Sequence, residues 1–371
     1  MYRNSPISVH ISSGEAHRIA DVKSLTTLLD FVARVPRVRL GEFPTPLVPL
    51  ERVGASLGLD LWMKRDECSG VALGGNKTRK LEYILADVKQ RGAHTVVTPG
   101  PLTSNHTMMT AAACRRVGLE IHCVVAGHPP AGPADWHGNL LLLDYLGARL
   151  HFSPMNFAEP TAEDSTRLAA LCAQVTAETS GYFIPGGGTM PQAEPGYMRC
   201  IAEIAQQRGG RVDFDHIVVA YGTGSTTTGI LLGLALGGFD ARVHPIAIST
   251  RHAVEVALQM PAPALHFMES VRHFGLALEA EHIPPHDITY GFAEEGYGVP
   301  NHGSDHAIRL MATAEGYFLD PVYTAKAFAG LQGLVARGDI APGSRVLFIH
   351  TGGLSMTTAR EKRYPGAGHT A

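Results

Sequence analysis

Short runs of β-branched and apolar residues alternate with longer segments of helical composition along most of this chain. A parallel sheet needs a crossover helix between neighbouring strands, so this alternation predicts an α/β fold. Two β-α-β units can be placed, and they indicate two α/β layers. We expect strands at 94–100, 119–127, 217–224, 243–250 and, late in the chain, 345–353, with helices at 104–118 and 225–238.

The composition narrows the class of protein. The chain has 371 residues, 45% of them hydrophobic, and a formal net charge of −3, which leaves no basic field to hold nucleic acid. Its five cysteines show no CxxC spacing, and the histidines show no HExxH, so we expect neither disulfides nor a metal site. The N-terminal residues do not resemble an export signal, and no apolar stretch is long enough for a membrane span. A cytoplasmic protein fits best.

Three segments rich in Gly, Ser, Thr and Asn follow predicted strands, at 98–106, 221–229 and 351–353. Open α/β sheets bind ligands beyond the carboxyl ends of their strands, so these segments are expected to line a cleft. Two irregular segments, 127–138 and 185–196, are expected as loops near it.

The motif GGNKTRK at 74–80 is the first candidate for chemistry. On a helix that begins near Asn76, Lys77 and Lys80 share a face, so one can bond to a cofactor aldehyde while the other reaches its phosphate. Asn76 is more typical of a turn residue. The alternative is a solvated basic helix start without a ligand.

Two further loops have the composition of anion sites. YGTGSTTTG at 221–229 lies between a strand and a helix and matches no nucleotide motif, so it predicts a site for phosphate without a nucleotide. TSNHT at 103–107 starts a helix and is suited to a substrate carboxylate. The alternatives are a tight turn with capping hydroxyls in the first loop and a simple N-cap in the second.

A lysine, a phosphate cradle and a carboxylate cradle that each follow a strand together describe a pyridoxal-phosphate (PLP) enzyme acting on an amino acid. At this point the chain resembles a known family, the D-cysteine desulfhydrase and 1-aminocyclopropane-1-carboxylate (ACC) deaminase group. The resemblance begins at about residue 43 and covers most of the chain from there. It rests on GGNKTRKLEY, TSNH, EEGYGVPN, DPVYTAKAFAGL and LFIHTGG in this order.

The resemblance implies the tryptophan-synthase-β-like fold, PLP fold type II, with two three-layer α/β/α domains and the cofactor in the cleft between them. It implies a large PLP-binding domain formed by residues 1–79 and 203–371, and a smaller inserted α/β domain at 80–202. Residues 1–40 are compatible with a helix packed on the large domain or on a partner subunit. A homodimer is the family expectation.

Site residues follow from matching positions. Lys77 corresponds to the Schiff-base lysine and Lys80 to the lysine that contacts the phosphate. Asn105 corresponds to the asparagine near the cofactor 3′-oxygen, and Ser104 to the serine facing the substrate. The remaining expected positions are the phosphate loop Gly222, Thr223, Gly224, Ser225 and Thr226, then His106 beside the substrate, the tyrosines Tyr297 and Tyr323, and Thr351 at the pyridine nitrogen.

Two positions separate the branches of the family. ACC deaminases resemble one another in carrying Glu after the DPVY tyrosine and Leu in place of the HTGG threonine, where this chain has Thr324 and Thr351. The desulfhydrase branch therefore fits better. A neutral threonine at the pyridine nitrogen gives a weaker electron sink than a carboxylate, which suits loss of a β-substituent better than ring opening.

The chain also departs from the family around the site. Family members usually have QSNH followed by Arg and Gln, whereas this chain has TSNHTMM, so polar groups beside the substrate are expected to be lost. Tyr221 replaces a small residue, and GGGT at 186–189 replaces GGS.

These observations predict an α,β-elimination in which Lys77 is released by transimination and removes the α-proton of a β-substituted amino acid. D-cysteine is the leading substrate, and pyruvate, ammonia and sulfide are the products. Ser104 and Asn105 would bind the carboxylate and the cofactor oxygen, and Tyr297 or Tyr323 would be an additional acid or base. The alternatives are an ACC deaminase, a lyase or β-replacement synthase for another β-substituted amino acid, and a non-catalytic protein that binds PLP or a phosphometabolite.

Overall fold

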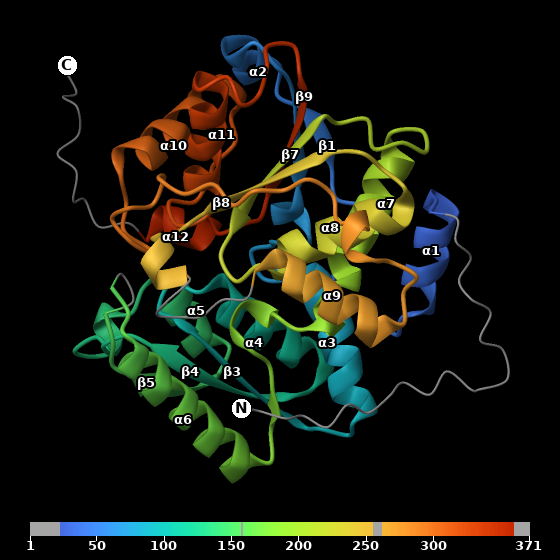
Figure 1. Ribbon diagram of the computed structural model, residues 1–371. Helices are drawn as coiled ribbons and strands as arrows, with labels where there is room; N and C mark the ends of the chain where they lie inside the picture. The colour runs from blue at the N-terminus through green and yellow to red at the C-terminus, as the bar shows by residue number, and fades with distance from the viewer. Residues whose placement is uncertain (1–22, 157–158, 255–261, 360–371) are drawn as a thin grey trace, which may run out of the picture.

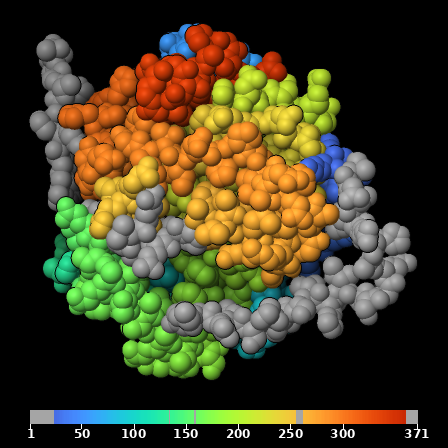
Figure 2. Space-filling model, viewed as in Figure 1, coloured from blue at the N-terminus to red at the C-terminus, as the bar shows by residue number. Residues whose placement is uncertain are grey.

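The computed structural model describes residues 23–156, 159–254 and 262–359. They form two sheets with helices packed on both faces of each (Figure 1). Figure 2 shows the same view with all atoms, in which α6 (Ala162–Thr179), in green, lies below α9 (Pro263–Phe274), in orange.

The larger sheet has five strands in the order β1 (Leu47–Pro49), β2 (Asp60–Arg65), β9 (Arg345–His350), β7 (His216–Tyr221) and β8 (Arg242–Ala247). The β1–β2 pair is antiparallel and the other pairs are parallel. The smaller sheet is parallel throughout, in the order β5 (Arg149–Ser153), β4 (Glu120–Ala126), β3 (Thr95–Pro101) and β6 (Tyr182–Phe183).

Alternate residues of the large sheet face two separate cores, as the two-residue period of a strand requires. Ile217 and Val219 of β7 face one core, whereas Val218 faces the other. The first core is covered by α1 (Leu25–Arg34), α7 (Pro195–Gln207), α8 (Ser225–Gly237) and α9. The second is covered by α2 (Glu51–Leu57), α10 (His302–Glu315) and α11 (Thr324–Ala336).

The small sheet is covered in the same way. Val96 of β3 faces a core shared with α3 (Lys77–Gln90), α4 (Asn105–Val117) and α5 (Gly138–Tyr145), and Val97 faces α6. A short helix, α12 (Leu354–Thr358), follows β9 and contacts α5. The predicted α/β fold with two three-layer units is thus confirmed.

The predicted elements agree with the structure apart from their ends. The expected strands at 217–224, 243–250 and 345–353 end three residues early, at Tyr221, Ala247 and His350. In each case the apolar run stops and the chain enters a segment rich in Gly, Ser and Thr. These segments leave the sheet and form the loops described below.

The proposed division of the chain at 79/80 and 202/203 stays a prediction. Both boundaries fall inside helices, α3 and α7, which contact one another. At the N-terminus, α1 packs on α7 and α8 in the first core of the large sheet, and residues 1–22 lie outside the described part of the chain. None of the described helices combines the length and apolar character that crossing a membrane requires.

Candidate active site

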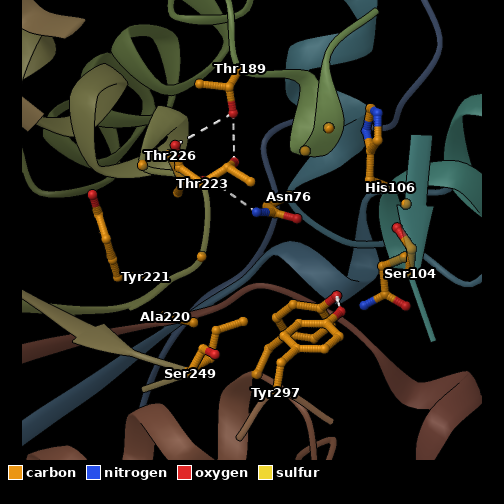
Figure 3. A pocket seen from close by; sticks show the side chains of 18 of the residues that line it. Asn76, Ser104, His106, Thr189, Ala220, Tyr221, Thr223, Thr226, Ser249 and Tyr297 are labelled. Carbon is orange, nitrogen blue, oxygen red and sulfur yellow. Dashed lines mark hydrogen bonds between the residues drawn. The ribbon is translucent and has the colours of Figure 1, made fainter. Parts of the chain in front are cut away.

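A cavity of about 430 Å³ lies beyond the carboxyl ends of strands from both sheets (Figure 3). Each of the three segments expected there contributes to its lining, through Ser104 after β3, Gly222 after β7 and Thr351 after β9. Of the two irregular loops, 185–196 contributes Gly186, Gly187 and Thr189, whereas no residue of 127–138 is among the lining residues. Parallel strands place their carboxyl ends at one edge, which explains the convergence.

Lys77 is the first residue of α3 and lines the cavity. Its Nζ donates a hydrogen bond to the carbonyl oxygen of Gly187 at 3.3 Å, and Nζ of Lys80 lies 3.5 Å from the same oxygen. The two lysines therefore share a helix face, as predicted. Lys80 is nearly fully buried but is not among the residues that line the cavity.

Burial and the neighbouring charge make Lys77 a nucleophile. Burial, and then the positive charge of Lys80, lower the pKa of Lys77 well below its ordinary value. Burial also lowers the pKa of Lys80 to about 8, although the carboxyl of Glu194 acts in the opposite direction. A lowered pKa favours the neutral amine of a lysine, which is the form that attacks an aldehyde or accepts a proton.

Two glycine-containing segments that are far apart in sequence place Lys77. Gly75 and Gly352 form a bridge between GGNKTRK and HTGG, and the N–H of Asn76 donates to the carbonyl of Thr351 at 3.0 Å. Gly75 has a φ of +135°, and a methyl group there would stand 2.8 Å from that carbonyl oxygen. The close approach therefore requires glycine.

A buried ionic cluster anchors the start of α3 from behind. The guanidinium of Arg79 donates to both oxygens of Asp66, at 2.7 and 2.9 Å, and to both oxygens of Glu203, each at 3.0 Å. The side chains of Arg79 and Asp66 are at most 1% exposed. Since β2 leads into Asp66 and α7 carries Glu203, the cluster ties α3 to the large sheet.

The loop between β7 and α8 has the geometry of an anion cradle. Gly224, with a φ of +90°, caps the 13-residue helix α8, whose first N–H groups are free to bind an anion. Thr223 and Thr189 are joined through their hydroxyls at 2.6 Å, as Figure 3 shows. Gly222, Thr223, Gly224 and Thr226 line the cavity, whereas the hydroxyl of Ser225 lies 3.5 Å from the carbonyl of Gly188 and Ser225 is not a lining residue.

Asn76, expected to be a turn residue, lines the cavity instead. Its side-chain amide donates to Oγ1 of Thr226 at 3.0 Å and so connects the lysine motif to the anion cradle. The residue does precede α3 as its N-cap, but its side chain makes no capping bond. The partner is 150 residues away, which is why the local motif did not reveal this contact.

The start of α4 forms the opposite end of the cavity. The Ser104 hydroxyl accepts the N–H of Thr107 at 3.2 Å, so the expected N-cap is present, and Ser104 also lines the cavity. The Asn105 side-chain oxygen accepts a hydrogen bond from Asn139 at 3.0 Å, and Asn139 in turn accepts one from Ser355 at 2.6 Å. Contacts from α5 and α12 therefore fix the orientation of Asn105.

His106 lines the cavity as a neutral imidazole. Burial, together with the charges of Lys77 and Lys80, lowers its pKa well below the ordinary value. Its Nε2 lies 2.7 Å from the hydroxyl of Thr98, and that hydroxyl donates to the carbonyl of Ile184. These bonds assign the proton to Nε2.

The methionines after TSNHT do not face the substrate end. Met108 and Met109 are buried in the core between α3, α4 and the small sheet, and neither lines the cavity. The expected loss of polar groups beside the substrate is therefore not seen at these two positions. On a helix, residues one turn beyond the N-cap lie deeper in the fold, whereas residues 104–106 stay at its open end.

Tyr297 and Tyr323 meet through their hydroxyls in the cavity. Burial raises the pKa of Tyr297 to about 12 and raises that of Tyr323 well above its ordinary value. Both phenols therefore keep their protons at neutral pH. They are suited to donate a proton rather than to accept one.

The two positions that separate the family branches differ in placement. Thr351 lines the cavity, whereas the Thr324 hydroxyl donates to the Asp320 carboxylate at 2.8 Å and Thr324 is not a lining residue. Asp320 also accepts the N–H groups of Val322 and Tyr323, each at 2.9 Å. Thr324 therefore belongs to the turn that positions Tyr323.

Several polar atoms around the cavity lack partners within the described part of the chain. Oγ1 of Thr227, Oγ of Ser249 and Nδ1 of His266 are buried and have no hydrogen-bond partner among the described residues, and all three residues line the cavity. Unpaired buried polar atoms are costly, so a polar ligand is expected there. Pyridoxal phosphate fits this arrangement, because the Lys77 amine, with its lowered pKa, suits the aldehyde and the start of α8 suits the phosphate.

The sequence had not singled out Thr189, Thr227, Ser249 or His266. Thr189 lay in the segment 185–196, which was expected as a loop near the cleft, and Thr227 lay in the predicted anion loop 221–229, but neither was named as a site residue. Ser249 and His266 belong to no recognised motif, so only the three-dimensional fold brings them to the cavity.

The comparisons with known proteins agree with this geometry. The family model described as "Pyridoxal-phosphate dependent enzyme" matches residues 38–352. A putative 1-aminocyclopropane-1-carboxylate deaminase of Pyrococcus horikoshii is 37% identical to this chain, covering 88% of it and 94% of the relative. A D-cysteine desulfhydrase of Yersinia pestis is also 37% identical, covering 88% of this chain and 96% of the relative.

A solved structure described as an ACC deaminase homologue superimposes with a TM-score of 0.75 at 35% identity, covering 89% of this chain and 95% of the other. The resemblance seen in the motifs therefore extends over nearly the whole described fold. The chain belongs to the family of pyridoxal-phosphate dependent enzymes.

Proposed function

We propose that this enzyme catalyses α,β-elimination on a β-substituted amino acid, with D-cysteine as the leading substrate and pyruvate, ammonia and sulfide as products. The observation that carries the proposal is that Lys77, whose pKa is lowered by burial, lines one cavity with Ser104 and the protonated pair Tyr297 and Tyr323. A relative at 37% identity that is named D-cysteine desulfhydrase supports it.

Lys77 would hold the cofactor through its aldehyde and would move the α-proton of the substrate. Bound PLP would supply the electron sink that makes this proton acidic. Burial and the charge of Lys80 disfavour the protonated form of Lys77, so its amine is suited to accept that proton.

The start of α4 binds the substrate carboxylate. This 13-residue helix begins at the same end of the cavity as Ser104 and carries the positive end of its dipole there. Asn105, oriented by Asn139, supplies a polar contact for the cofactor oxygen. His106 lines this end without adding charge, because its pKa is low.

The tyrosine pair offers a hydrogen bond to the leaving group. Sulfur leaves as the hydrosulfide anion, and a phenol that keeps its proton at neutral pH stabilises this charge by donating a hydrogen bond. The shared hydrogen bond lets Tyr297 and Tyr323 act as a unit, so the role is assigned to the pair.

ACC deaminase is the second candidate, because relatives at 37% and 35% identity are named putative ACC deaminases. Thr351 lines the cavity where the pyridine nitrogen is expected, and a hydroxyl there stabilises a protonated ring less than a carboxylate does. This favours elimination over ring opening. Lyases or β-replacement synthases for other β-substituted amino acids share the same machinery.

A substrate screen tests the proposal. Purified holoenzyme is incubated with D- and L-cysteine, other β-substituted alanines and ACC, while pyruvate, sulfide and 2-oxobutanoate are measured. We expect pyruvate and sulfide in equal amounts from D-cysteine. Formation of 2-oxobutanoate from ACC alone would identify a deaminase, and no product from any substrate would favour a non-catalytic binding protein.

We further propose a cytoplasmic homodimer. The five cysteines are all free in the structure, which is compatible with a reducing compartment. The dimer rests on family resemblance. Sedimentation equilibrium of the purified protein tests it, and a monomer mass at micromolar concentration would contradict it.

A further inference from the structure

Two unpartnered polar atoms near the start of α8 extend the anion cradle beyond the residues Gly222 to Thr226. Nδ1 of His266 is buried without a partner among the described residues, and so is Oγ1 of Thr227. His266 is 9% exposed and Thr227 is 1% exposed, yet both line the cavity. They come from different helices, α9 and α8, which pack together.

Gly224 locates His266 relative to the cradle. A methyl group built on Gly224 would stand 3.5 Å from Nδ1 of His266 and 3.5 Å from the hydroxyl of Tyr221. His266 therefore lies beside the residue that caps α8, where the free N–H groups begin. Thr227 follows Thr226 in the first turn of the same helix.

We propose that His266 and Thr227 are phosphate ligands of the bound cofactor, in addition to Lys80 and the loop from Gly222 to Thr226. A phosphate group carries three oxygens that each accept several hydrogen bonds, so the loop alone leaves acceptor capacity unused. The oxygens of a phosphate group at this place would supply acceptors for both orphaned side-chain atoms. The inference concerns only cofactor binding and holds for whichever substrate the enzyme uses.

The protonation of His266 is compatible with this role. Burial lowers its pKa below the ordinary value, and the charge of Lys80 acts in the same direction, whereas Glu269 opposes them. The ring is therefore neutral in the absence of a ligand, and its Nδ1–H tautomer donates one hydrogen bond to the phosphate. Such a bond to a charged acceptor changes affinity by about tenfold or more.

Comparing PLP with pyridoxal isolates the phosphate. We would prepare apoprotein of the wild type and of His266→Leu, His266→Gln, Thr227→Val and Thr227→Ser. Each is titrated with PLP and with pyridoxal, which lacks the phosphate, and binding is followed by cofactor absorbance. Inorganic phosphate is then tested as a competitor of PLP. His273→Leu, on the exposed side of α9, is the matched control.

We expect His266→Leu and Thr227→Val each to weaken PLP binding by about tenfold while leaving pyridoxal binding nearly unchanged. His266→Gln and Thr227→Ser keep a donor and should retain most of the affinity. Inorganic phosphate should compete less well in the two weakened variants. His273→Leu should match the wild type in every titration.

Equal losses for PLP and pyridoxal would overturn the inference, because they would indicate a general disturbance of the cavity. An unchanged ratio of the two affinities in both His266→Leu and Thr227→Val would overturn it as well. If His266→Leu does not fold, as judged by circular dichroism, Thr227→Val alone decides by the same ratio. Failure of the proposed elimination would leave these binding results unaffected.

Discussion

At the scale of single residues, the two lysines of GGNKTRK have different proposed roles toward the same cofactor. Lys77 is the amine that we propose to react, and burial and then the charge of Lys80 lower its pKa. Because both Nζ atoms lie near the carbonyl of Gly187, their separation is fixed by α3 and by that loop. The chemistry of Lys77 thus depends on a neighbour that does not react.

Replacing Lys80 with methionine should raise the pKa of Lys77. In the wild type, the rate of PLP incorporation into apoprotein should depend less on pH between about pH 7 and pH 9 than in the variant, because burial and the charge of Lys80 lower the pKa of Lys77. In Lys80→Met the rate should rise with pH over this range, because the lowering charge is gone. Stopped-flow absorbance measures the profile. A parallel, uniformly slower profile would mean that Lys80 serves the phosphate alone.

Glu194 is a second residue with an unusual protonation state. Burial raises the pKa of this carboxyl from 4.5 to about 8, against the opposing charge of Lys80. A raised pKa in the folded state means that the native protein binds the proton more tightly than the unfolded chain. The resulting stabilisation is complete below about pH 4.5 and is lost as the pH rises through about 8.

Glu194→Gln should therefore gain stability relative to the wild type as the pH rises. The difference in free energy of unfolding between variant and wild-type apoprotein should shift by at least about 1 kcal/mol from pH 5.5 to pH 8.5. Urea denaturation of both proteins at the two pH values measures this difference in unfolding free energy. The same difference at both pH values would show that Glu194 does not titrate in this range.

At the scale of elements, the position of α3 depends on buried charge. Arg79 is held by Asp66 and Glu203, and burial of these groups is tolerated because each is paired. The charge of Arg79 is the main cause that lowers the pKa of Asp66 against the effect of burial. Three elements, β2, α3 and α7, therefore meet in one ionic cluster beneath the catalytic lysine.

Arg79→Met should cost about 3–5 kcal/mol of unfolding free energy, because it leaves the buried Asp66 carboxylate without its ion-pair partner, whereas Glu203 keeps its pair with Lys64. Arg242→Met removes an exposed pair with Asp287 and is the matched control, with an expected change below about 1 kcal/mol. Chemical denaturation of the wild type and both variants at one pH measures the two changes in unfolding free energy. Equal, small effects would show that the cluster does not anchor α3.

At the scale of the whole molecule, the sequence predicted the architecture because the signals for it are local. Apolar strands, helical composition and glycine-rich strand ends are each readable within some ten residues, as at 345–353. The positions of Lys77, Ser104 and Thr351 at one cavity followed from the rule that ligands bind at the carboxyl ends of parallel strands.

What the sequence could not show depends on packing between distant segments. Asn76 contacts Thr226 across 150 residues, and His266 reaches the cradle only because α9 packs on α8. Met108 and Met109 stand beside the substrate motif in sequence but turn into the core. A short motif shows neither the direction in which a side chain points nor its distance from a segment far away in the sequence.

The central claim is that Lys77 forms the covalent bond to the cofactor, and absorbance spectroscopy tests it most directly. Wild-type protein, Lys77→Ala and the control Lys89→Ala, which changes an exposed lysine of the same helix, are each purified with excess PLP. We expect the absorbance band of a lysine-bound cofactor in the wild type and in Lys89→Ala, and its loss in Lys77→Ala. An unchanged spectrum in Lys77→Ala would show that Lys77 does not form this bond.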